Sequence, residues 1–289
     1  MISNNLSANS GTKFGTVALV GLPNAGKSTL VNAIVGEKVS IVTSKSHTTR
    51  ERILGVCSDR VNQICMIDTP GLDQSKHRYQ RSTLQHIWEA IEQADFAGYL
   101  MDPKVALATH DEWLYRLTEQ GLNKPIHIII TKFDRLTPEK KHDLTAVIEE
   151  YNKKYNVFIT SALKKNGLST LHEFWVRNIG YGPWQFESTT KKTMDLAKFA
   201  EEITREQAMN RLFKDIPHCL EVIHEDWEEN GNVITIQQSI NVERHSQKAI
   251  VIGKNGQCLK AIGIASRTYL SKVWKKDVRL YLTVKNAKR

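Results

Sequence analysis

GLPNAGKS, at residues 21–28, stands between the apolar run 16–20 and the amphipathic segment 29–35. A G-x-x-x-x-G-K-S motif between a strand and a helix is typical of a phosphate-binding loop, because its glycines let backbone N–H groups turn toward anionic oxygens. We expect Lys27 to contact the outer phosphates and the Ser28 hydroxyl to bind Mg²⁺. The candidate phosphate-binding residues are Gly21, Asn24, Ala25, Gly26, Lys27, Ser28 and Thr29.

Short apolar runs alternate with amphipathic stretches on both sides of this motif, which predicts parallel strands joined by crossover helices. The predicted strands are 16–20, 52–56, 63–67, 97–101, 125–130 and 156–160. The predicted helices are 29–35, 80–92, 111–119, 138–151 and 168–177. The predicted fold class is α/β, with one doubly wound, mostly parallel six-stranded domain at 14–178 that follows a disordered N-terminal segment, 1–13.

Three further motifs end predicted strands, in the order expected of a guanine nucleotide site. DTPG, at 68–71, would place a carboxylate near the metal and a flexible glycine at the γ-phosphate. TKFD, at 131–134, contains Asp134, whose carboxylate can accept both N1–H and N2–H of guanine, a donor pair that adenine lacks. TSAL, at 160–163, offers backbone donors to the guanine oxygen. The candidate residues are Asp68, Thr69, Pro70, Gly71, Thr131, Lys132, Asp134, Ser161, Ala162 and Leu163.

The second part of the chain predicts a smaller α+β domain, 195–289, after a linker at 179–194, where IGYGPWQFESTT breaks the periodicity. Its predicted αββααβ order is helix 195–214, strands 219–226 and 233–242, helices 246–252 and 257–272, and strand 277–284. GKNG, at 253–256, is a G-x-x-G loop that lets a sugar-phosphate backbone approach closely. The candidate RNA-binding residues are Gly253, Lys254, Asn255, Gly256, Lys260 and Arg267, and Lys272, Lys275 and Lys276 would extend the basic surface.

The charge distribution favours a polyanionic partner for this second domain. The 289 residues carry a formal net charge of +9, but residues 244–289 hold 12 basic residues and one acidic residue, whereas 179–243 hold 6 and 12. A composition that is 40% hydrophobic and 25% charged excludes wholly disordered and fibrous classes. The chain has no apolar run of membrane-spanning length, and its four cysteines are scattered without a CxxC pair, so we expect a reduced, cytoplasmic protein.

The ordered motifs of the first domain resemble those of the translation-factor-like GTPases. In such proteins a switch threonine closes over Mg²⁺ and the γ-phosphate. Within HTTRE, at 47–51, the resemblance implies that this residue is Thr49, with Thr48 as the alternative. The resemblance further implies Lys27, Thr49 and Gly71 as catalytic residues and Ser28, Thr49 and Asp68 as the metal ligands.

Three positions affect the expected chemistry. Thr131 stands where this family usually has Asn, and Leu72 stands where small signalling GTPases carry a Gln that orients the attacking water. A leucine cannot hydrogen-bond that water. Asn24 lies in the phosphate loop, where similar GTPases use an Asn to hold K⁺. We therefore expect slow hydrolysis that depends on Lys27, Mg²⁺ and K⁺.

Together the two domains resemble the Era family of ribosome-assembly GTPases over about residues 14–285, including HTTRE, DTPG, GPW at 182–184 and NVERHSQKAIVIGKNG at 241–256. The resemblance implies a type II KH domain that binds single-stranded RNA near the 3′ end of 16S ribosomal RNA in assembly of the 30S subunit. GTP or GDP, bound with Mg²⁺, would gate that RNA binding. We expect a monomer with peripheral contact to the inner membrane. Relatives commonly continue beyond the position of VKNAKR, so the resemblance does not imply here any contact that such an extension makes.

Three other functions share parts of this pattern. An ATPase or kinase would use the same phosphate loop with a different base reader, and Asp134 with Lys132 argues against it. A non-enzymatic RNA-binding module with a vestigial nucleotide pocket would account for Leu72 and Thr131. A membrane-signalling GTPase would place the basic C-terminal segment on anionic lipid, whereas the G-x-x-G loop favours RNA.

Overall fold

The computed structural model describes residues 11–43, 53–72, 79–119, 124–213, 216 and 220–287, without the side chains of 79–83. These residues form two compact units. The first contains the described residues of 11–40 and 53–193, and the second contains 41–43 and those from 194 onward. Each unit has its own sheet and its own hydrophobic core.

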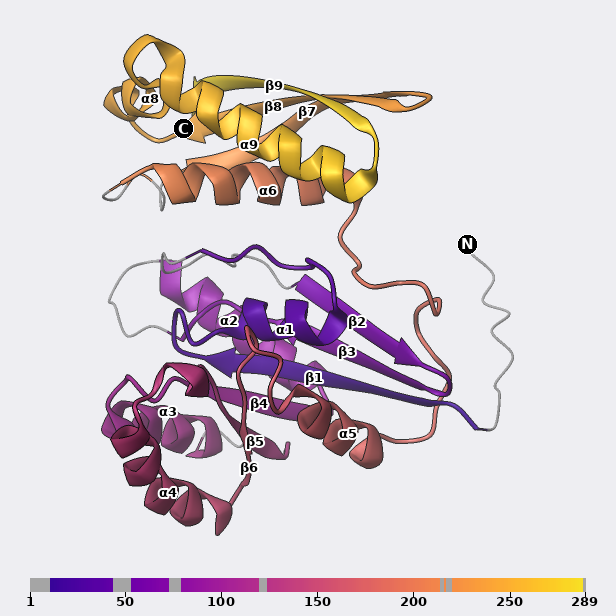
Figure 1. The fold of residues 1–289 in the computed structure, drawn as a ribbon, viewed down its shortest axis with the longest axis vertical. Helices are drawn as coiled ribbons and strands as arrows, with labels where there is room; N and C mark the ends of the chain where they lie inside the picture. The colour runs from indigo at the N-terminus through magenta and orange to yellow at the C-terminus, as the bar shows by residue number, and fades with distance from the viewer. Residues whose placement is uncertain are drawn as a thin grey trace. The chain divides into compact units, whose positions relative to one another are not determined.

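A six-stranded sheet in the order β2-β3-β1-β4-β5-β6 forms the centre of the first unit (Figure 1). Its strands are β1 (Lys13–Gly21), β2 (Ile53–Asp59), β3 (Asn62–Asp68), β4 (Phe96–Met101), β5 (Ile126–Ile130) and β6 (Asn156–Ile159). β2 is antiparallel to β3, and the other neighbouring pairs are parallel. The predicted doubly wound, mostly parallel sheet is therefore confirmed. Lys13, which the sequence placed in the disordered segment, is the first residue of β1, because its N–H is bonded to the Val61 carbonyl at 2.8 Å.

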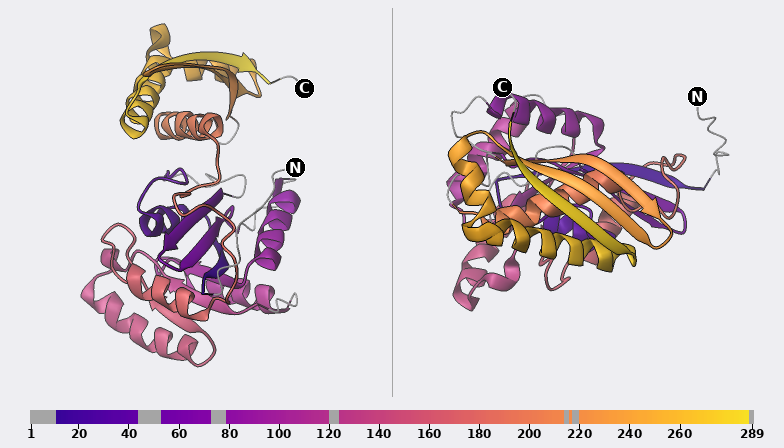
Figure 2. Two further views of the ribbon diagram at one scale, coloured as in Figure 1. Left: turned by 90° about the vertical axis from the view of Figure 1, so that its right-hand side faces the viewer. Right: turned by 90° about the horizontal axis from the view of Figure 1, so that it is seen from above.

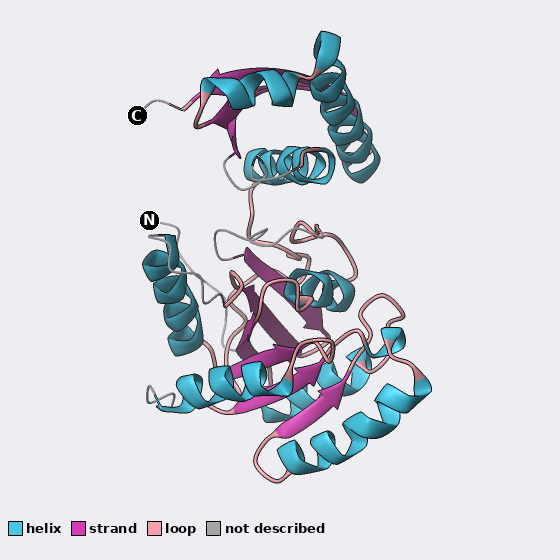
Figure 3. Cartoon of the chain, turned by 90° about the vertical axis from the view of Figure 1, so that its left-hand side faces the viewer, coloured by secondary structure: helices cyan, strands magenta, loops and turns pink. Residues whose placement is uncertain are grey.

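Helices cover both faces of this sheet (Figure 2, left, and Figure 3). They are α1 (Lys27–Val35), α2 (Tyr79–Gln93), α3 (Leu107–Glu119), α4 (Pro138–Asn152) and α5 (Leu168–Asn178), with a 3₁₀ turn, η1 (Phe133–Arg135), after β5. Alternate residues of the central strands, such as Ala18, Tyr99 and Ile128, pack in one core with α2, α3 and α4. α5 packs on the opposite face, where its Trp175 lies against Gly98. Burial on both faces explains why these strands are apolar runs without alternation.

The segment that the sequence predicts as a linker packs against the first unit. Its main chain binds the buried side chain of Gln63, which accepts from the N–H groups of Gln185 and Phe186 and donates to the Phe186 carbonyl at 2.9 Å. Further along, Val56 N–H donates to the Lys191 carbonyl at 2.8 Å. Residues up to Thr193 thus belong to the first unit, and the chain passes into the second at Met194.

The second unit has a three-stranded sheet in the order β7-β8-β9. Its elements are α6 (Leu196–Arg211), β7 (Leu220–Asn230), β8 (Val233–Val242), α8 (His245–Ile252), the 3₁₀ turn η2 (Lys254–Gly256), α9 (Gln257–Trp274) and β9 (Asp277–Asn286). β7 is antiparallel to β8, and β9 is parallel to β8. The predicted αββααβ order of a small α+β domain is confirmed.

One face of this small sheet carries the core of the second unit. Apolar residues of β8 and β9 pack against Phe199 and Ile203 of α6 and Leu270 of α9, and Val251 of α8 joins the same side. Ile41, from the segment after α1, is also buried in this core, which the sequence did not indicate. The other face of the sheet is open in the view from above (Figure 2, right). Among the helices that the structure describes, none is long and apolar enough to cross a membrane.

Acid should destabilise the first unit through His127. This β5 side chain is 3% exposed, lies among Phe96, Phe158 and Phe174, and has no hydrogen-bond partner for either ring nitrogen within the described part of the chain. Burial lowers its pKa to about 4, so the folded state favours neutral His127. The contribution of neutral His127 to the stability of the folded state is fully present above pH 6.5, the pKa of histidine in the unfolded chain, and is lost as the pH falls toward 4. We expect a loss of about 2 kcal/mol between pH 7.5 and pH 5.

Urea unfolding of native protein and His127→Phe at both pH values measures this effect, because phenylalanine keeps the aromatic packing and cannot be protonated. The variant should lose less of its free energy of unfolding on acidification. His142→Phe, at an exposed position of α4, is the matched control and should retain the native dependence. Equal losses for native protein and His127→Phe would show that His127 does not cause the acid sensitivity.

Candidate functional site

The phosphate-binding motif forms a loop that wraps around the Lys27 ammonium. Gly26 has a φ of 104° and directly precedes α1, so the loop enters the helix through a conformation that favours glycine. Lys27 Nζ donates to the carbonyls of Gly21 at 2.9 Å and Leu22 at 3.0 Å, and the residue is 7% exposed. Burial lowers the pKa of Lys27 to about 8. The negative charge of Asp68 raises this pKa, and the positive charge of Lys132 lowers it further. The ammonium is thus held within the loop at the N-terminus of a helix, where anions bind.

The DTPG motif lies against this loop at the end of β3. Ser28 Oγ donates to Asp68 Oδ2 at 2.6 Å, which brings together the two described residues that the sequence assigns to the metal. A Cβ atom on Gly71 would lie 2.8 Å from the backbone of Pro23, so only glycine allows the two loops to pack this closely. Thr69 is buried, and its hydroxyl donates to the Leu19 carbonyl at 2.7 Å.

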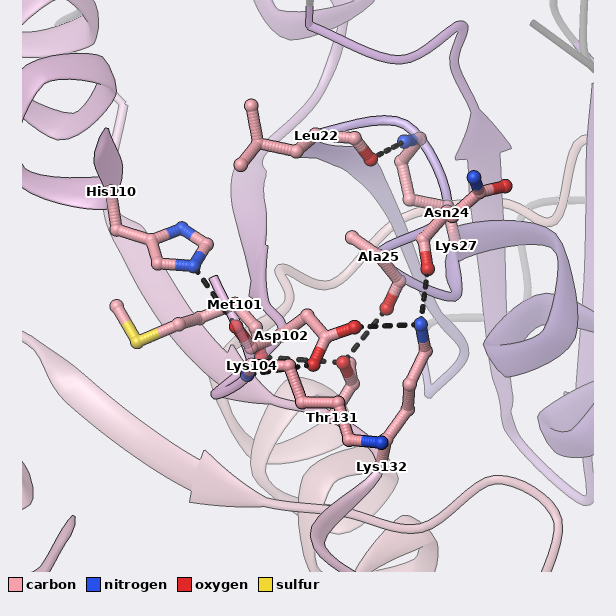
Figure 4. A network of polar contacts seen from close by, with 10 residues as sticks. All are labelled: Leu22, Asn24, Ala25, Lys27, Met101, Asp102, Lys104, His110, Thr131 and Lys132. Carbon is pink, nitrogen blue, oxygen red and sulfur yellow. Dashed lines mark hydrogen bonds and ion pairs between the residues drawn. The ribbon is translucent and has the colours of Figure 1, made fainter. Parts of the chain in front are cut away.

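Thr131 and Lys132 of the TKFD motif contact the loop at 21–28 (Figure 4). Thr131 Oγ1 contacts the carbonyls of Ala25 at 2.8 Å and Met101 at 3.2 Å. A hydroxyl at this position therefore reaches the phosphate loop directly. Lys132 has a φ of 55°, and its Nζ donates to the Asn24 carbonyl and to Asp102 Oδ2, the latter at 2.7 Å.

Asp134 lies beside the motif at the end of β6. Its Oδ1 accepts a 2.6 Å hydrogen bond from Ser161 Oγ, and this bond lowers the pKa of the Asp134 carboxyl. Ser161 is 2% exposed and is paired with Asn166 through two backbone hydrogen bonds. Leu163, in contrast, is 65% exposed. An ionised Asp134 can accept N–H groups, as guanine recognition requires.

Asp102 is a residue of this site that the sequence analysis missed. It directly follows β4, and its carboxylate accepts from Lys132. Its position in the sequence could have indicated this role, because Asp102 is an acidic residue immediately after the buried run 96–101, at the same sheet edge as the other motifs.

Leu72 is 1% exposed and packs in the core, so it does not act on a substrate water. Thr48 and Thr49 lie outside the described residues.

The G-x-x-G loop joins α8 to α9 and contains three residues with positive φ: Gly253 at 74°, Asn255 at 51° and Gly256 at 75°. The two glycines have different roles. A Cβ atom on Gly253 would lie 2.7 Å from Cys258 Cβ, whereas a Cβ atom on Gly256 would meet no atom within 4 Å. Gly253 allows the loop to pack on α9, while Gly256 leaves its outer side accessible.

The predicted RNA-binding residues other than the two glycines lie on the exterior of the second unit. Lys254, Asn255, Lys260 and Arg267 are exposed. Lys260 and Arg267 flank the partly exposed Ile264 at helical spacing, so the three share one face of α9. Lys276 instead forms an ion pair with Glu229 of β7. The exposed basic residues of α9 therefore lie beside an apolar side chain, a combination suited to nucleic acid.

The fold and the phosphate loop define the first unit as a GTPase domain of the P-loop class, joined to a KH-type second unit. Residues 16–132 match the family described as 50S ribosome-binding GTPase, and residues 215–289 match the KH domain family. The chain belongs to the Era family of GTPases.

The similarity to relatives and to solved structures extends over most of the chain and supports this assignment. The chain is 36% identical to GTPase Era of Brucella suis biovar 1 (strain 1330) over 275 residues, which cover 95% of this chain and 88% of that protein. The crystal structure of Era with MgGDPNP and nucleotides 1506–1542 of 16S ribosomal RNA has a TM-score of 0.89 at 34% identity, covering 96% of this chain and 94% of that one. A point variant of Aquifex aeolicus Era bound to GDP and AlF₄⁻ gives the same TM-score at 32% identity and the same coverage.

Proposed function

We propose that the first unit binds GTP and GDP through loops at the carboxyl edge of its sheet. The observation that carries this proposal is the direct bonding of Thr131 and Lys132 to the carbonyls of Ala25 and Asn24, which joins the phosphate loop to the base motif. Asp134 would accept from the guanine base, and the 161–163 backbone would contact its oxygen. The phosphate contacts would come from 21–29 and 68–71. Era binds MgGDPNP in the related crystal structure.

The residues present fit a Mg²⁺ ion. Ser28 Oγ and Asp68 Oδ2, which are 2.6 Å apart, are the hard oxygen ligands that Mg²⁺ prefers, and this ion commonly takes few protein ligands alongside substrate phosphates. We propose Ser28 and Asp68 as ligands, with Thr49 as the switch ligand. The bound ion would neutralise charge on the transferring phosphoryl group. Lys27 would contact the outer phosphates, and Gly71 would contact the γ-phosphate.

We propose that K⁺ contributes to hydrolysis at Asn24, because Leu72 supplies no group that orients water. Asn24 is exposed and has a φ of 62°. Replacing K⁺ by Na⁺ should lower GTP turnover by about tenfold, a barrier change of about 1.4 kcal/mol. Asn24→Gly keeps a residue suited to positive φ and removes the amide, so its turnover should respond little to the exchange. Equal turnover of native protein in both salts would contradict the K⁺ proposal.

We propose that the second unit binds single-stranded RNA near the 3′ end of 16S ribosomal RNA and that the protein acts in assembly of the 30S subunit. The observation that carries this is the G-x-x-G loop, whose Gly256 is open on its outer side beside exposed Lys254. The Era crystal structure contains nucleotides 1506–1542 of 16S ribosomal RNA. GTP-bound switches would raise RNA affinity, and RNA would raise GTP affinity by the same factor.

Gly256→Asp tests the RNA proposal, because it places a carboxylate where a phosphate backbone would approach. Gly256→Asn is the matched control: asparagine tolerates positive φ as well as aspartate does and differs from it by charge. With a single-stranded copy of the 16S 3′ end and a GTP analogue, the Asp variant should bind at least about tenfold more weakly than the Asn variant. Native protein should bind better with the analogue than with GDP. Equal binding by both variants would contradict this use of the loop.

We further propose that the protein is a cytoplasmic monomer with peripheral contact to the inner membrane. The support for membrane contact is the basic segment 244–289, since exposed lysine and arginine side chains are attracted to anionic lipid. The same surface would face RNA, so lipid and RNA would compete for it.

A further inference from the structure

Asp102 lies where three loops of the first unit meet (Figure 4). Its Oδ2 accepts from Lys132 Nζ at 2.7 Å, and its Oδ1 accepts from the Lys104 N–H at 3.0 Å. The Asp102 side chain is 13% exposed and that of Lys132 is 25% exposed. This ion pair is partly removed from water, so its attraction is less screened than that of a surface pair.

The ammonium of Lys132 bridges these loops. Besides Asp102, which follows β4, it binds the Asn24 carbonyl of the phosphate loop, while its own backbone belongs to the loop after β5. A lysine side chain is flexible, because its compact charge stands at the end of a four-carbon stem with rotatable bonds. Asn24 offers a neutral oxygen, whereas Asp102 supplies the negative charge that holds the ammonium at this point.

A buried pair of side chains holds Asp102 in turn. His110 Nε2 lies 3.2 Å from the Asp102 carbonyl, and His110 Nδ1 lies 3.0 Å from the Tyr99 hydroxyl. Since a carbonyl can only accept, Nε2 carries the proton, and Nδ1 accepts from Tyr99. Burial lowers the pKa of His110, which favours this neutral form. β4 and α3 thus fix the backbone from which the carboxylate extends.

We infer that Asp102 is a positioning residue for guanine nucleotide binding, which acts by holding Lys132 between the phosphate loop and the base motif. The inference rests on the proposed nucleotide site. None of the proposed phosphate or base contacts involves Asp102. Its loss leaves the catalytic lysine, Lys27, and the base reader, Asp134, in place. Nucleotide affinity should therefore fall while the rate of hydrolysis of bound GTP stays the same.

The test compares Asp102→Asn with native protein. Asparagine keeps the size and an acceptor oxygen but removes the charge. GDP and GTP affinity should fall about tenfold, KM should rise in parallel, and single-turnover hydrolysis at saturating protein should stay within about twofold of native. Asp102→Glu, which restores the charge, should recover part of the affinity. Glu112→Gln, at an exposed α3 position paired with Arg116, is the matched control and should bind as native does.

A double-mutant cycle with Lys132→Ala separates positioning from a general structural role. If Asp102 acts through Lys132, then Asp102→Asn should change affinity by less than about twofold in the Lys132→Ala background. Native affinity in Asp102→Asn, or an equal loss in both backgrounds, would overturn the inference alone. Unchanged affinity in Lys132→Ala would overturn both the inference and the assignment of Lys132 to the nucleotide site. Thermal unfolding of each variant establishes that folded proteins are compared.

Discussion

Replacing Lys27 by alanine is expected to lower the rate of GTP hydrolysis by at least about a hundredfold. Lys27 is 7% exposed at the start of α1, and its ammonium is within 3.0 Å of two loop carbonyls. Water would screen the attraction between this ammonium and a phosphate oxygen in the loop only weakly. Charge that develops on the transferring phosphoryl group is stabilised most strongly by such a preorganised cation, and alanine provides no substitute.

Phosphate release at saturating GTP measures this effect in purified protein, with thermal unfolding to show that the variant is folded. Lys153→Ala is the matched control, because its side chain is 71% exposed at the end of α4 and pairs only with Glu150 among the described residues. The control should keep native turnover. Turnover of Lys27→Ala above about a tenth of native would show that another group supplies the charge.

Most of the first unit could be predicted because its signals are local. The apolar run before the phosphate loop and the glycine at 26 set the ends of β1 and α1 to within three residues of the prediction. β7 shows where local signals fail. The strand continues through Trp227 to Asn230, where the last three residues, Glu228, Glu229 and Asn230, have low strand propensity. It is a strand because it pairs residue by residue with Ile236 through Val233 of β8.

The parts of the site that the sequence could not provide depend on contacts between distant segments. Thr131 departs from the usual asparagine, and the sequence could not show that its hydroxyl reaches Ala25, 106 positions away. Asp102 has no motif of its own, and its partner Lys132 is 30 positions away. The predicted linker breaks the apolar periodicity with Gly, Pro, Ser and Thr, which suggests a free segment, yet Gln63 binds its backbone across more than 120 positions.

The guanine preference should reverse in Asp134→Asn. The carboxylate of Asp134 offers two acceptors to the N1–H and N2–H donors of guanine, whereas an asparagine side chain offers one acceptor and one donor group. The Ser161 hydroxyl now donates to Asp134 Oδ1 at 2.6 Å. If it keeps donating to the asparagine oxygen, the NH₂ group faces the N2 position. With guanine, the asparagine NH₂ and the N2 amino group are then two donors that face each other. Xanthine has a carbonyl oxygen at that position, which can accept from the NH₂ group.

We expect the ratio of GDP to XDP affinity to fall by at least about a thousandfold in Asp134→Asn, because a site built around paired hydrogen bonds rejects a base that leaves them unmade. Competition of GDP, XDP, IDP and ADP against a fluorescent guanine nucleotide measures the ratio. IDP lacks the N2 amino group, so native protein should bind it more weakly than GDP. Asp143→Asn, an exposed carboxylate-to-amide change on α4, should keep the native order. The substitution exchanges one oxygen for one nitrogen and alters no other described part of the proposed contact. An unchanged ratio in Asp134→Asn would therefore mean that another residue reads the base.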